Sequence, residues 1–455
     1  MSWGTDYVDQ WMNDHLEDMV CDVKEENFGK AHLFDSLKFD LEEELYPRCA
    51  NFTRLSATLK LFSLKERNGW IDKSFTELLE LLKEMLPKNN MLHIYNYVAK
   101  KILCPMGFEY EKIHACPNDC VLYRDAFASL KVCPTCGLSR LKKKIDGSGD
   151  EDKDGPPTKV MWYLPIIPRF KWLFSIKEDA KNLKWHIDGS KCDNLLWHLV
   201  DSPQWKKIDE TFPDFGAEPR NLRLGLATNG MNPYGNLSSK HSSWPVFLMI
   251  YNLSLLLCMQ RKYMMLFMMI SGPRQPRNDI NVYLNSLIDD MKLLWKEGID
   301  VYDSYCQETF CLRAMLFCTI NDFLAYGNLS GYSVKGHFAC PICEENISYI
   351  QLKHGKKTVY TKHWKFLPQN HPYHRMKKAF NGSLEDEVVM RPHNGEEVYN
   401  QVKNIDIVFD KHQKKKTTEK NIWKKWSIFF NIPYWCKLEV RHCIDMMHVE
   451  NKCMS

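Results

Sequence analysis

The chain has 455 residues, of which 44% are apolar and 13% aromatic, so it can form a sizeable core in two or three domains and is not a largely disordered protein. Its net charge of +4 by itself neither favours nor excludes a nucleic-acid partner. Seventeen cysteines is an odd number, and the first residues lack the basic start and apolar stretch of a signal peptide, so we expect a reducing compartment rather than a secreted disulfide scaffold.

The first 110 residues are predicted to form an acidic arm and a helical region. Residues 1–46 carry thirteen acidic side chains against three lysines. Residues 47–110 are expected to be helical, because the apolar residues from Phe75 to Leu82 repeat near a 3.6-residue period, with Ser74 and Thr76 as capping hydroxyls. Such a stripe predicts packing in a helical bundle, and a partner surface is the alternative.

Four cysteines within residues 111–141 have the spacing of a zinc knuckle. The pattern C-x3-C-x12-C-x2-C is formed by Cys116, Cys120, Cys133 and Cys136. Two such pairs can close tetrahedrally on one structural zinc ion. Four buried free cysteines are the alternative, and contact between this module and DNA is left open. Residues 142–158, rich in charge, glycine and proline, are predicted to be a flexible linker.

Residues 159–455 contain an ordered series of predicted elements. Strands are expected at Leu222–Thr228, Val246–Leu257 and Tyr263–Ile270, then a helix at 280–297 and a fourth strand at Phe310–Ile320. The helix is expected to follow a cap at Asn278-Asp279, to end at Gly298, and to bury one face formed by Val282, Leu287, Met291 and Leu294. The apolar run that starts at Trp244 is too short and too polar to cross a membrane, so no membrane segment is expected.

Three strands, a helix and a fourth strand are the opening order of a ribonuclease-H-like fold. The sequence therefore predicts an α+β multidomain protein with a ribonuclease-H-like α/β core. In that architecture, acidic groups from the first strand and from the end of the fourth strand meet and share divalent metals. Asp322 follows the fourth strand, whereas the first strand is followed by Asn229. Turn residues without a metal are the alternative at both positions, and Asp279, Asp289 and Asp290 are interpreted as helix cap and solvated face.

A lysine-rich segment near the end of the chain is a candidate nucleic-acid contact. Its lysines interleave with Trp423 and Trp426, so ammonium groups could contact phosphates while the rings stack on bases. A solvated loop is the alternative. The candidate residues are Lys414, Lys415, Lys416, Lys424 and Lys425.

Several longer motifs point to one known family. They are Tyr110–Cys120, Trp185–Asp188, Asp201–Trp205, Arg220–Gly230 with Asn232–Asn236, Trp244–Val246, Asn278–Tyr283, Asn321–Gly331 and Ile444–Glu450. Together they resemble the plant CACTA (En/Spm-type) transposases of the tnp2 family over nearly the whole chain. The resemblance implies a nuclear DDE/D transposase that binds transposon ends and cuts and joins DNA with magnesium or manganese.

The chain departs from this family at two places. The family has aspartate in its Asp-Gly-Phe-x-Pro-Phe motif, where this chain has Asn229. The family also continues well past the motif Ile444–Glu450, and by resemblance to it and to the V(D)J recombinase the third acid is expected beyond residue 455, with Glu450 a poor substitute. We therefore expect a truncated core that is incomplete at its C-terminus and a catalytically impaired enzyme. A non-enzymatic DNA-binding or regulatory protein, able to associate with itself or with an intact transposase, is the alternative, and a relic without a role is a third.

The V(D)J recombinase also suggests a second zinc site. There a cysteine pair after the second acid joins a late histidine pair, which here implies a site formed by Cys340, Cys343, His442 and His448. Surface or core histidines are the alternative. The histidines at 337, 371 and 374 compete for the same metal.

Overall fold

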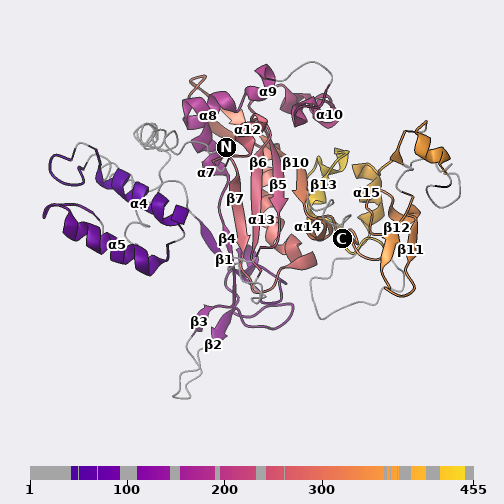
Figure 1. Cartoon of the computed structure of the whole chain (residues 1–455), viewed down its shortest axis with the longest axis horizontal. Helices are drawn as coiled ribbons and strands as arrows, with labels where there is room; N and C mark the ends of the chain where they lie inside the picture. The colour runs from indigo at the N-terminus through magenta and orange to yellow at the C-terminus, as the bar shows by residue number, and fades with distance from the viewer. Residues whose placement is uncertain are drawn as a thin grey trace. The chain divides into compact units, whose positions relative to one another are not determined.

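A computed structural model of the chain describes residues 43–49, 51–68, 70–92, 110–143, 154–189, 195–231, 242–260, 262–362, 366–368, 370–376, 378, 391–405 and 421–445 (Figure 1). Contacts divide the chain into two compact units. The first comprises residues 1–111, 164–182 and 300–310, and the second comprises 112–163, 183–299 and 311–455. Among the residues described, no helix is long and apolar enough to cross a membrane.

The first unit is mainly helical. Its helices are α4 (Arg54–Asn68), α5 (Asp72–Met85), α7 (Ile167–Ser175) and α8 (Lys177–Asn182). The helical prediction is confirmed for α5, whose apolar face buries Phe75 and Leu79. The predicted caps are wrong, because α5 begins at Asp72 and Ser74 and Thr76 lie inside it. Leu45 is buried against the helical residues around Ala57. Residues 43–46, which were predicted to belong to the acidic arm, therefore pack with the helical region.

A seven-stranded mixed sheet forms the core of the second unit. Its strands lie in the order β1-β4-β7-β6-β5-β10-β13. Their bounds are β1 Glu111–Ala115, β4 Lys159–Tyr163, β5 Leu222–Thr228, β6 Trp244–Ile250, β7 Met265–Ile270, β10 Ala314–Asn321 and β13 His442–Ile444. Strand β5 is antiparallel to β6, and β6 is antiparallel to β7, whereas β5 and β13 both run parallel to β10. Four strands, β5, β7, β10 and β13, therefore end at the same edge of the sheet.

The strand predictions are confirmed where turn residues bound the apolar runs. Strand β5 has the predicted bounds. The strand predicted at Val246–Leu257 is too long, because β6 ends at Ile250 and the short helix α12 (Leu255–Cys258) follows. The run Phe310–Ile320 is divided at Arg313 into β9 (Glu308–Leu312) and β10, and β9 pairs with β8 (Ile299–Asp303) in a separate two-stranded sheet.

Helix α13 (Ile280–Lys296) packs along the sheet and ends as predicted (Figure 1). Gly298 adopts φ +71°, a left-handed conformation that terminates a helix readily only at glycine. Leu287, Met291 and Leu294 are fully buried, but Val282 is only half-buried. The buried face is therefore centred on Tyr283 and Leu287. Asp279 stands at the N-cap without a side-chain cap hydrogen bond.

The second unit also contains further helices and two small sheets. They are α9 (Trp185–Asp188), α10 (Pro203–Thr211), α11 (Pro213–Gly216), α14 (Phe323–Ser330), α15 (Gly395–Val402), and the two-stranded sheets β2 (Leu141–Lys143) with β3 (Asp154–Pro157) and β11 (Tyr349–Gln351) with β12 (Thr358–Tyr360). The ends of the predicted linker therefore pair as strands. Because β1 belongs to the large sheet, the cysteine module lies in the same unit as the core.

Candidate metal centre and strand-end site

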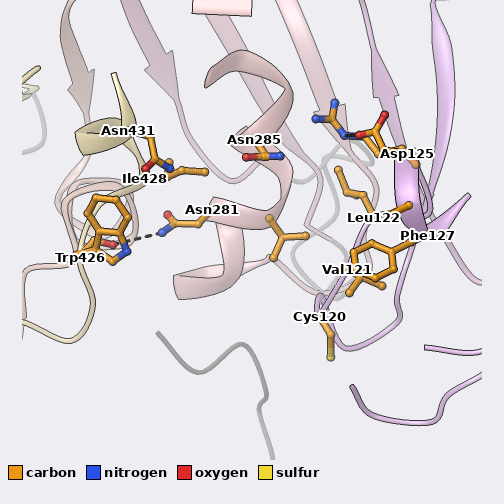
Figure 2. Close-up of a pocket in the computed structure, with 13 residues that line it drawn as sticks. Cys120, Val121, Leu122, Asp125, Phe127, Asn281, Asn285, Trp426, Ile428 and Asn431 are labelled. Carbon is orange, nitrogen blue, oxygen red and sulfur yellow. Dashed lines mark hydrogen bonds and ion pairs between the residues drawn. The ribbon is translucent and has the colours of Figure 1, made fainter. Parts of the chain in front are cut away.

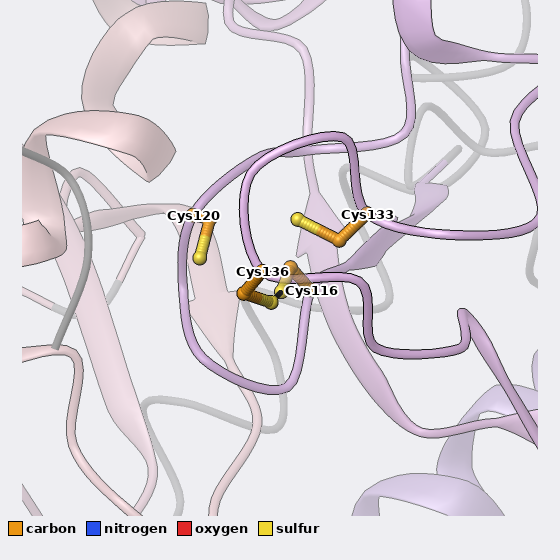
Figure 3. A group of neighbouring side chains, drawn as sticks. All are labelled: Cys116, Cys120, Cys133 and Cys136. Carbon is orange, nitrogen blue, oxygen red and sulfur yellow. Dashed lines mark hydrogen bonds between the residues drawn. The ribbon is translucent and has the colours of Figure 1, made fainter. Parts of the chain in front are cut away.

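The four predicted cysteines come together into one cluster. Their Sγ atoms all lie within 4.8 Å of one another, and those of Cys116 and Cys136 are 3.4 Å apart (Figure 3). A tetrahedral zinc ion with Zn–S bonds of about 2.3 Å needs sulfur atoms about 3.8 Å apart, so the donor set and its spacing fit such a metal. Within the described ranges this is the only group of three or more His, Cys, Asp or Glu side chains that could hold a metal ion.

Two tight turns bring these cysteines together. Cys116 N–H donates to Val121 O and Cys133 N–H donates to Leu138 O, each at 2.9 Å, so each pair closes a short hairpin. The first turn places Asp119 at φ 64°, and the second places Gly137 at φ +72°. Left-handed conformations of this kind favour Asp, Asn and Gly, which is why these residue types stand inside the knuckles.

The thiols differ in their readiness to ionise. Burial raises the pKa of Cys116 to about 11 and raises that of Cys120 further. At Cys133 burial is outweighed by backbone N–H groups of Cys136 and Thr135, which lower its pKa. A metal must displace the protons held by the buried thiols, so its binding releases protons and weakens as the pH falls.

A buried ion pair fastens the first cysteine turn to the core. The Lys159 ammonium at the start of β4 donates to the Asp119 carboxylate, which also accepts a 2.5 Å hydrogen bond from the Tyr283 hydroxyl of α13. All three side chains are buried. Asp119 has no role predicted from the sequence, although it lies between two candidate ligands, Cys116 and Cys120. The cysteine module is therefore held rigidly against β4 and α13.

Three polar residues follow the ends of three neighbouring parallel strands. Thr228 of β5 pairs with Asn321 of β10, and Ile444 of β13 pairs with the same Asn321. One residue further along each strand stand Asn229, Asp322 and Asp445. Asp445 N–H donates to Asn321 O at 2.9 Å, which continues the register. We call these three residues the strand-end row. Asp445 was missed from the sequence because β13 has only three residues, and the acid directly after His442–Ile444 is the signal that could have found it.

A buried chain of hydrogen bonds supports the strand-end row. Thr228 N–H donates to Asn321 Oδ1 at 3.2 Å, and Asn321 Nδ2 donates to Thr319 Oγ1 at 2.8 Å. Thr319 Oγ1 in turn lies 2.8 Å from His442 Nδ1. The chain therefore joins β5, β10 and β13 just inside their carboxyl ends, and it fixes the register on which the row depends.

Asp322 has a structural role in addition to its place in the row. Its Oδ1 accepts a 2.6 Å hydrogen bond from Ala325 N–H and caps α14. The side chain is half-buried, whereas Asn229 is exposed. Capping uses one carboxylate oxygen and leaves the other available.

The four residues of the expected second zinc site are not assembled in the described structure. His442 lies in β13 among aromatic rings, with that of Trp435 at 5.5 Å, and burial lowers its pKa to about 3. Cys343 is buried, and Cys340 O accepts a hydrogen bond from the Tyr332 hydroxyl at 3.0 Å. His448 lies outside the described residues. Cys340, Cys343 and His442 do not form a ligand group of three, so this site stays a prediction.

The competing histidines are engaged elsewhere. His337 stacks on Tyr349 with ring centroids 4.2 Å apart. His371 Nδ1 accepts from Tyr373 N–H at 3.3 Å, and His374 Nε2 lies 3.3 Å from Leu367 O. None of the three belongs to a metal-ligand group in the described part of the chain.

The lysine-rich segment is only partly described. Lys414, Lys415 and Lys416 lie outside the described residues, and Lys424 is exposed as a phosphate contact requires. The prediction is wrong for Lys425, which is 4% exposed and donates at 2.6 Å to both Asn278 O and Asn281 Oδ1. Trp423 is also buried, and its Nε1 donates to Gln401 Oε1, so it cannot stack on a base.

The fold and the two sites define an α/β protein with a four-cysteine cluster that could hold a metal and with acidic residues at its strand ends. Residues 193–405 match the family model described as Transposase family tnp2. This stretch runs from the segment before α10 to the end of α15 and includes Asn229 and Asp322. The match supports a transposase of this family and a transposase-type function. No curated protein matches the chain.

Proposed function

We propose that the chain is a CACTA (En/Spm-type) transposase-derived protein that binds DNA and whose metal-dependent cleavage and strand transfer are impaired. The strand-end row is the observation that carries this proposal. It places one amide, Asn229, and two carboxylates, Asp322 and Asp445, across three adjacent parallel strands. The match of residues 193–405 to the tnp2 transposases supports DNA as the substrate class.

Strand order supports a ribonuclease-H-like core in this proposal. Three antiparallel strands, β7, β6 and β5, are continued by two parallel strands, β10 and β13, and α13 lies between β7 and β10 in the chain. This agrees with the order expected from the sequence. The family resemblance implies a third acid beyond residue 455, and Asp445 is an alternative within the chain.

The row explains why catalysis is impaired. Divalent metals bound there would activate water and then a 3′-hydroxyl for in-line attack on a phosphodiester. Asp322 and Asp445 supply charged oxygen ligands, which magnesium and manganese prefer. Asn229 supplies an amide oxygen without charge, so it holds a cation weakly. The four-cysteine cluster has a separate role as a structural zinc site, which stiffens the module beside the sheet.

Restoring the missing charge tests this proposal. Nicking of supercoiled plasmid with manganese is compared for the wild type and for Asn229→Asp, Asn229→Asp/Asp445→Asn and Asn229→Asp/Asp322→Asn. We expect the single variant to nick the plasmid above the wild type and both double variants to lose that gain. Equal nicking by Asn229→Asp and Asn229→Asp/Asp445→Asn would show that Asp445 does not belong to the metal site. No gain in Asn229→Asp would contradict the strand-end row as a metal site.

A non-enzymatic DNA-binding or regulatory protein is the second candidate. The specific observation in its favour is that Asp322 already caps α14 while Asn229 brings no charge. A protein of this kind would bind duplex DNA in fluorescence anisotropy, and none of the variants would cleave it.

Nuclear location and association with itself or with an intact transposase belong to the same proposal. Light scattering of the purified chain, alone and mixed with an intact transposase, tests the association.

A further inference from the structure

A pocket of ≈ 390 Å³ opens beside the cysteine module in the second unit (Figure 2). One wall is formed by Cys120–Leu122 and Arg124–Phe127. The floor is the first part of α13, with Asn281 and Asn285. The opposite wall is the segment from Trp426 to Asn431. This volume is at the small end of the range of ligand pockets, so it suits a group of the size of one nucleobase and excludes a duplex.

Both walls are fastened to α13, so the pocket is formed before any ligand arrives. Arg124 Nη1 donates to Ser286 Oγ at 2.7 Å, and its Nη2 pairs with Asp289, which fixes the wall of the cysteine module. Asn281 Nδ2 donates to Trp426 O at 3.3 Å, which fixes the other wall. A site formed in advance loses little conformational entropy on binding.

The lining combines flat aromatic rings with amide groups. Trp426 and Phe127 come from opposite walls, and Phe127 is 39% exposed. Asn285 and Asn431 are exposed, and no hydrogen bond joins either amide to another residue in the described part of the chain. Each amide offers two donors and one acceptor, which match the edges of nucleobases, while aromatic rings stack on bases of any sequence.

The charge of the pocket argues against a phosphate as its ligand. Among the described residues that line the pocket, Arg124 is the only cation, and it is paired with Asp289 and Asp125. An anion would therefore meet no surplus positive charge from these residues. A neutral planar group with donors and acceptors on its edge fits better.

The pocket lies at the edge of the sheet that carries the strand-end row. Strand β7 is parallel to β5 through two antiparallel pairings, so Ile270 and Thr228 end at the same edge. After Ile270 the chain reaches the start of α13 within ten residues, where Asn281 lines the pocket. Asp119 and Lys159, which anchor the cysteine module, stand at this edge as well, because β4 begins beside the end of β7.

We propose that this pocket takes one unpaired base of a DNA strand that is held at the strand-end row. The inference rests on the proposed DNA-binding function and adds to it a site for a single base. Trp426 and Phe127 supply the stacking surfaces, and Asn285 and Asn431 bind the edge of the base. A strand that gives up a base in this way would run along the same edge of the sheet as Asp322.

The experiment measures binding of three fluorescein-labelled duplexes to the full chain by anisotropy. One duplex carries a single unpaired adenine, the second carries an abasic site at the same place, and the third is fully paired. We expect the unpaired adenine to be bound roughly 5- to 150-fold more tightly than the abasic site, the range that one base–aromatic stack contributes. Phe127→Ala and Asn285→Ala should reduce this ratio while leaving binding of the paired duplex unchanged.

Exposed residues away from the pocket supply the controls. Tyr373→Ala matches Phe127→Ala, because Tyr373 is 48% exposed, and Asn370→Ala matches Asn285→Ala. Both controls should keep the wild-type ratio. Because the two pocket residues are exposed, their replacement should not unfold the chain, and circular dichroism checks this.

The outcomes separate this inference from the proposed function. Binding of all three duplexes with a ratio near one, or a ratio that Phe127→Ala and Asn285→Ala leave unchanged, would overturn the base site while DNA binding stands. Failure of the wild type to bind any of the three duplexes would overturn both. If the control variants lost as much of the preference for the unpaired adenine over the abasic site as the pocket variants, the base site would also be overturned.

Discussion

At the scale of single residues, several charged side chains have roles that their sequence context does not show. Lys425 stands in a lysine-rich segment and Asp290 on the helix face that was expected to be solvated, yet both are mostly buried. A sequence shows which charges are present but not which of them the fold encloses. Burial is decided by contacts such as that between Lys425 and Asn281, which are 144 residues apart in the chain.

Asp290 should make the protein less stable as the pH rises. Burial raises the pKa of Asp290 to about 6, and the Tyr163 hydroxyl donates to its Oδ2 at 2.7 Å. Because the pKa in the folded state lies above the unfolded value, the contribution to stability is complete below about pH 4 and is lost as the pH rises through about 6. Asp290→Asn keeps an acceptor for Tyr163, so it should raise the free energy of unfolding near neutral pH by up to about 3 kcal/mol.

Urea unfolding at acidic and at neutral pH measures this effect. The stabilisation by Asp290→Asn should disappear at the acidic pH. Asp289→Asn is the matched control, because the Asp289 side chain is 52% exposed and its pair with Arg124 should contribute about 1 kcal/mol or less. An equal effect of both substitutions at neutral pH would contradict the role of burial.

Asp119 should be among the most sensitive positions in the chain. Replacing Asp119 by Asn leaves the Lys159 ammonium buried without its partner, and breaking a buried pair in this way typically costs about 3–5 kcal/mol. Asp119→Asn/Lys159→Met removes both charges and should recover most of that loss. Thermal unfolding of the two variants measures the difference. A double variant as unstable as the single one would mean that Asp119 acts mainly through Tyr283.

At the scale of elements, substitutions of Asp322 can distinguish its structural role as a helix cap from a role in metal binding. Asn is as good an N-cap as Asp, so Asp322→Asn should keep the stability of α14, whereas Asp322→Ala should lose about 0.5–2 kcal/mol. Both substitutions remove the charge and should weaken manganese binding equally, as followed by the loss of the free-ion signal in electron paramagnetic resonance. Unchanged manganese binding in Asp322→Asn would limit Asp322 to capping.

The cysteine cluster should hold one zinc ion per chain. Native mass spectrometry of the full chain counts the metal, and Cys116→Ser or Cys133→Ser should abolish its binding, because each removes one of four ligands. Ser substitution at the exposed Cys306 is the control and should keep the count. A second zinc that is lost with Cys340→Ser would show that the cysteine pair and the late histidines meet in solution.

The elements that could be predicted are those with local signals. Strand β5 alternates between turn residues, and α13 has both a clear period and Gly298 as its end. Strand β13 could not be found, because three residues carry no period and its place depends on pairing with β10 far along the chain. For the same reason the sequence located Asn229 and Asp322 but not Asp445, and it located the four cysteines but not the pair Asp119 and Lys159 that anchors them.

At the scale of the molecule, the sheet and the cysteine module form one unit rather than two domains joined by a linker. Strand β1, which leads into Cys116, is part of the seven-stranded sheet, and Asp119 contacts both Lys159 and Tyr283. Arg124 adds two further contacts to α13. The folding of the module and that of the sheet should therefore be coupled.

Removing the metal tests this coupling. If the module and the sheet fold together, a strong chelator should increase hydrogen exchange in the module and in α13 around Tyr283 and Ser286, because these residues lose their partners. Helix α5, which belongs to the other unit, is the internal control and should keep its exchange rate. Arg124→Ala should reduce the effect of the chelator on α13 around Ser286, since it removes one of the two attachments through which the module acts on the helix. Faster exchange confined to residues 111–141 would instead describe a module that folds independently, and the base pocket between it and α13 would then not be formed in advance.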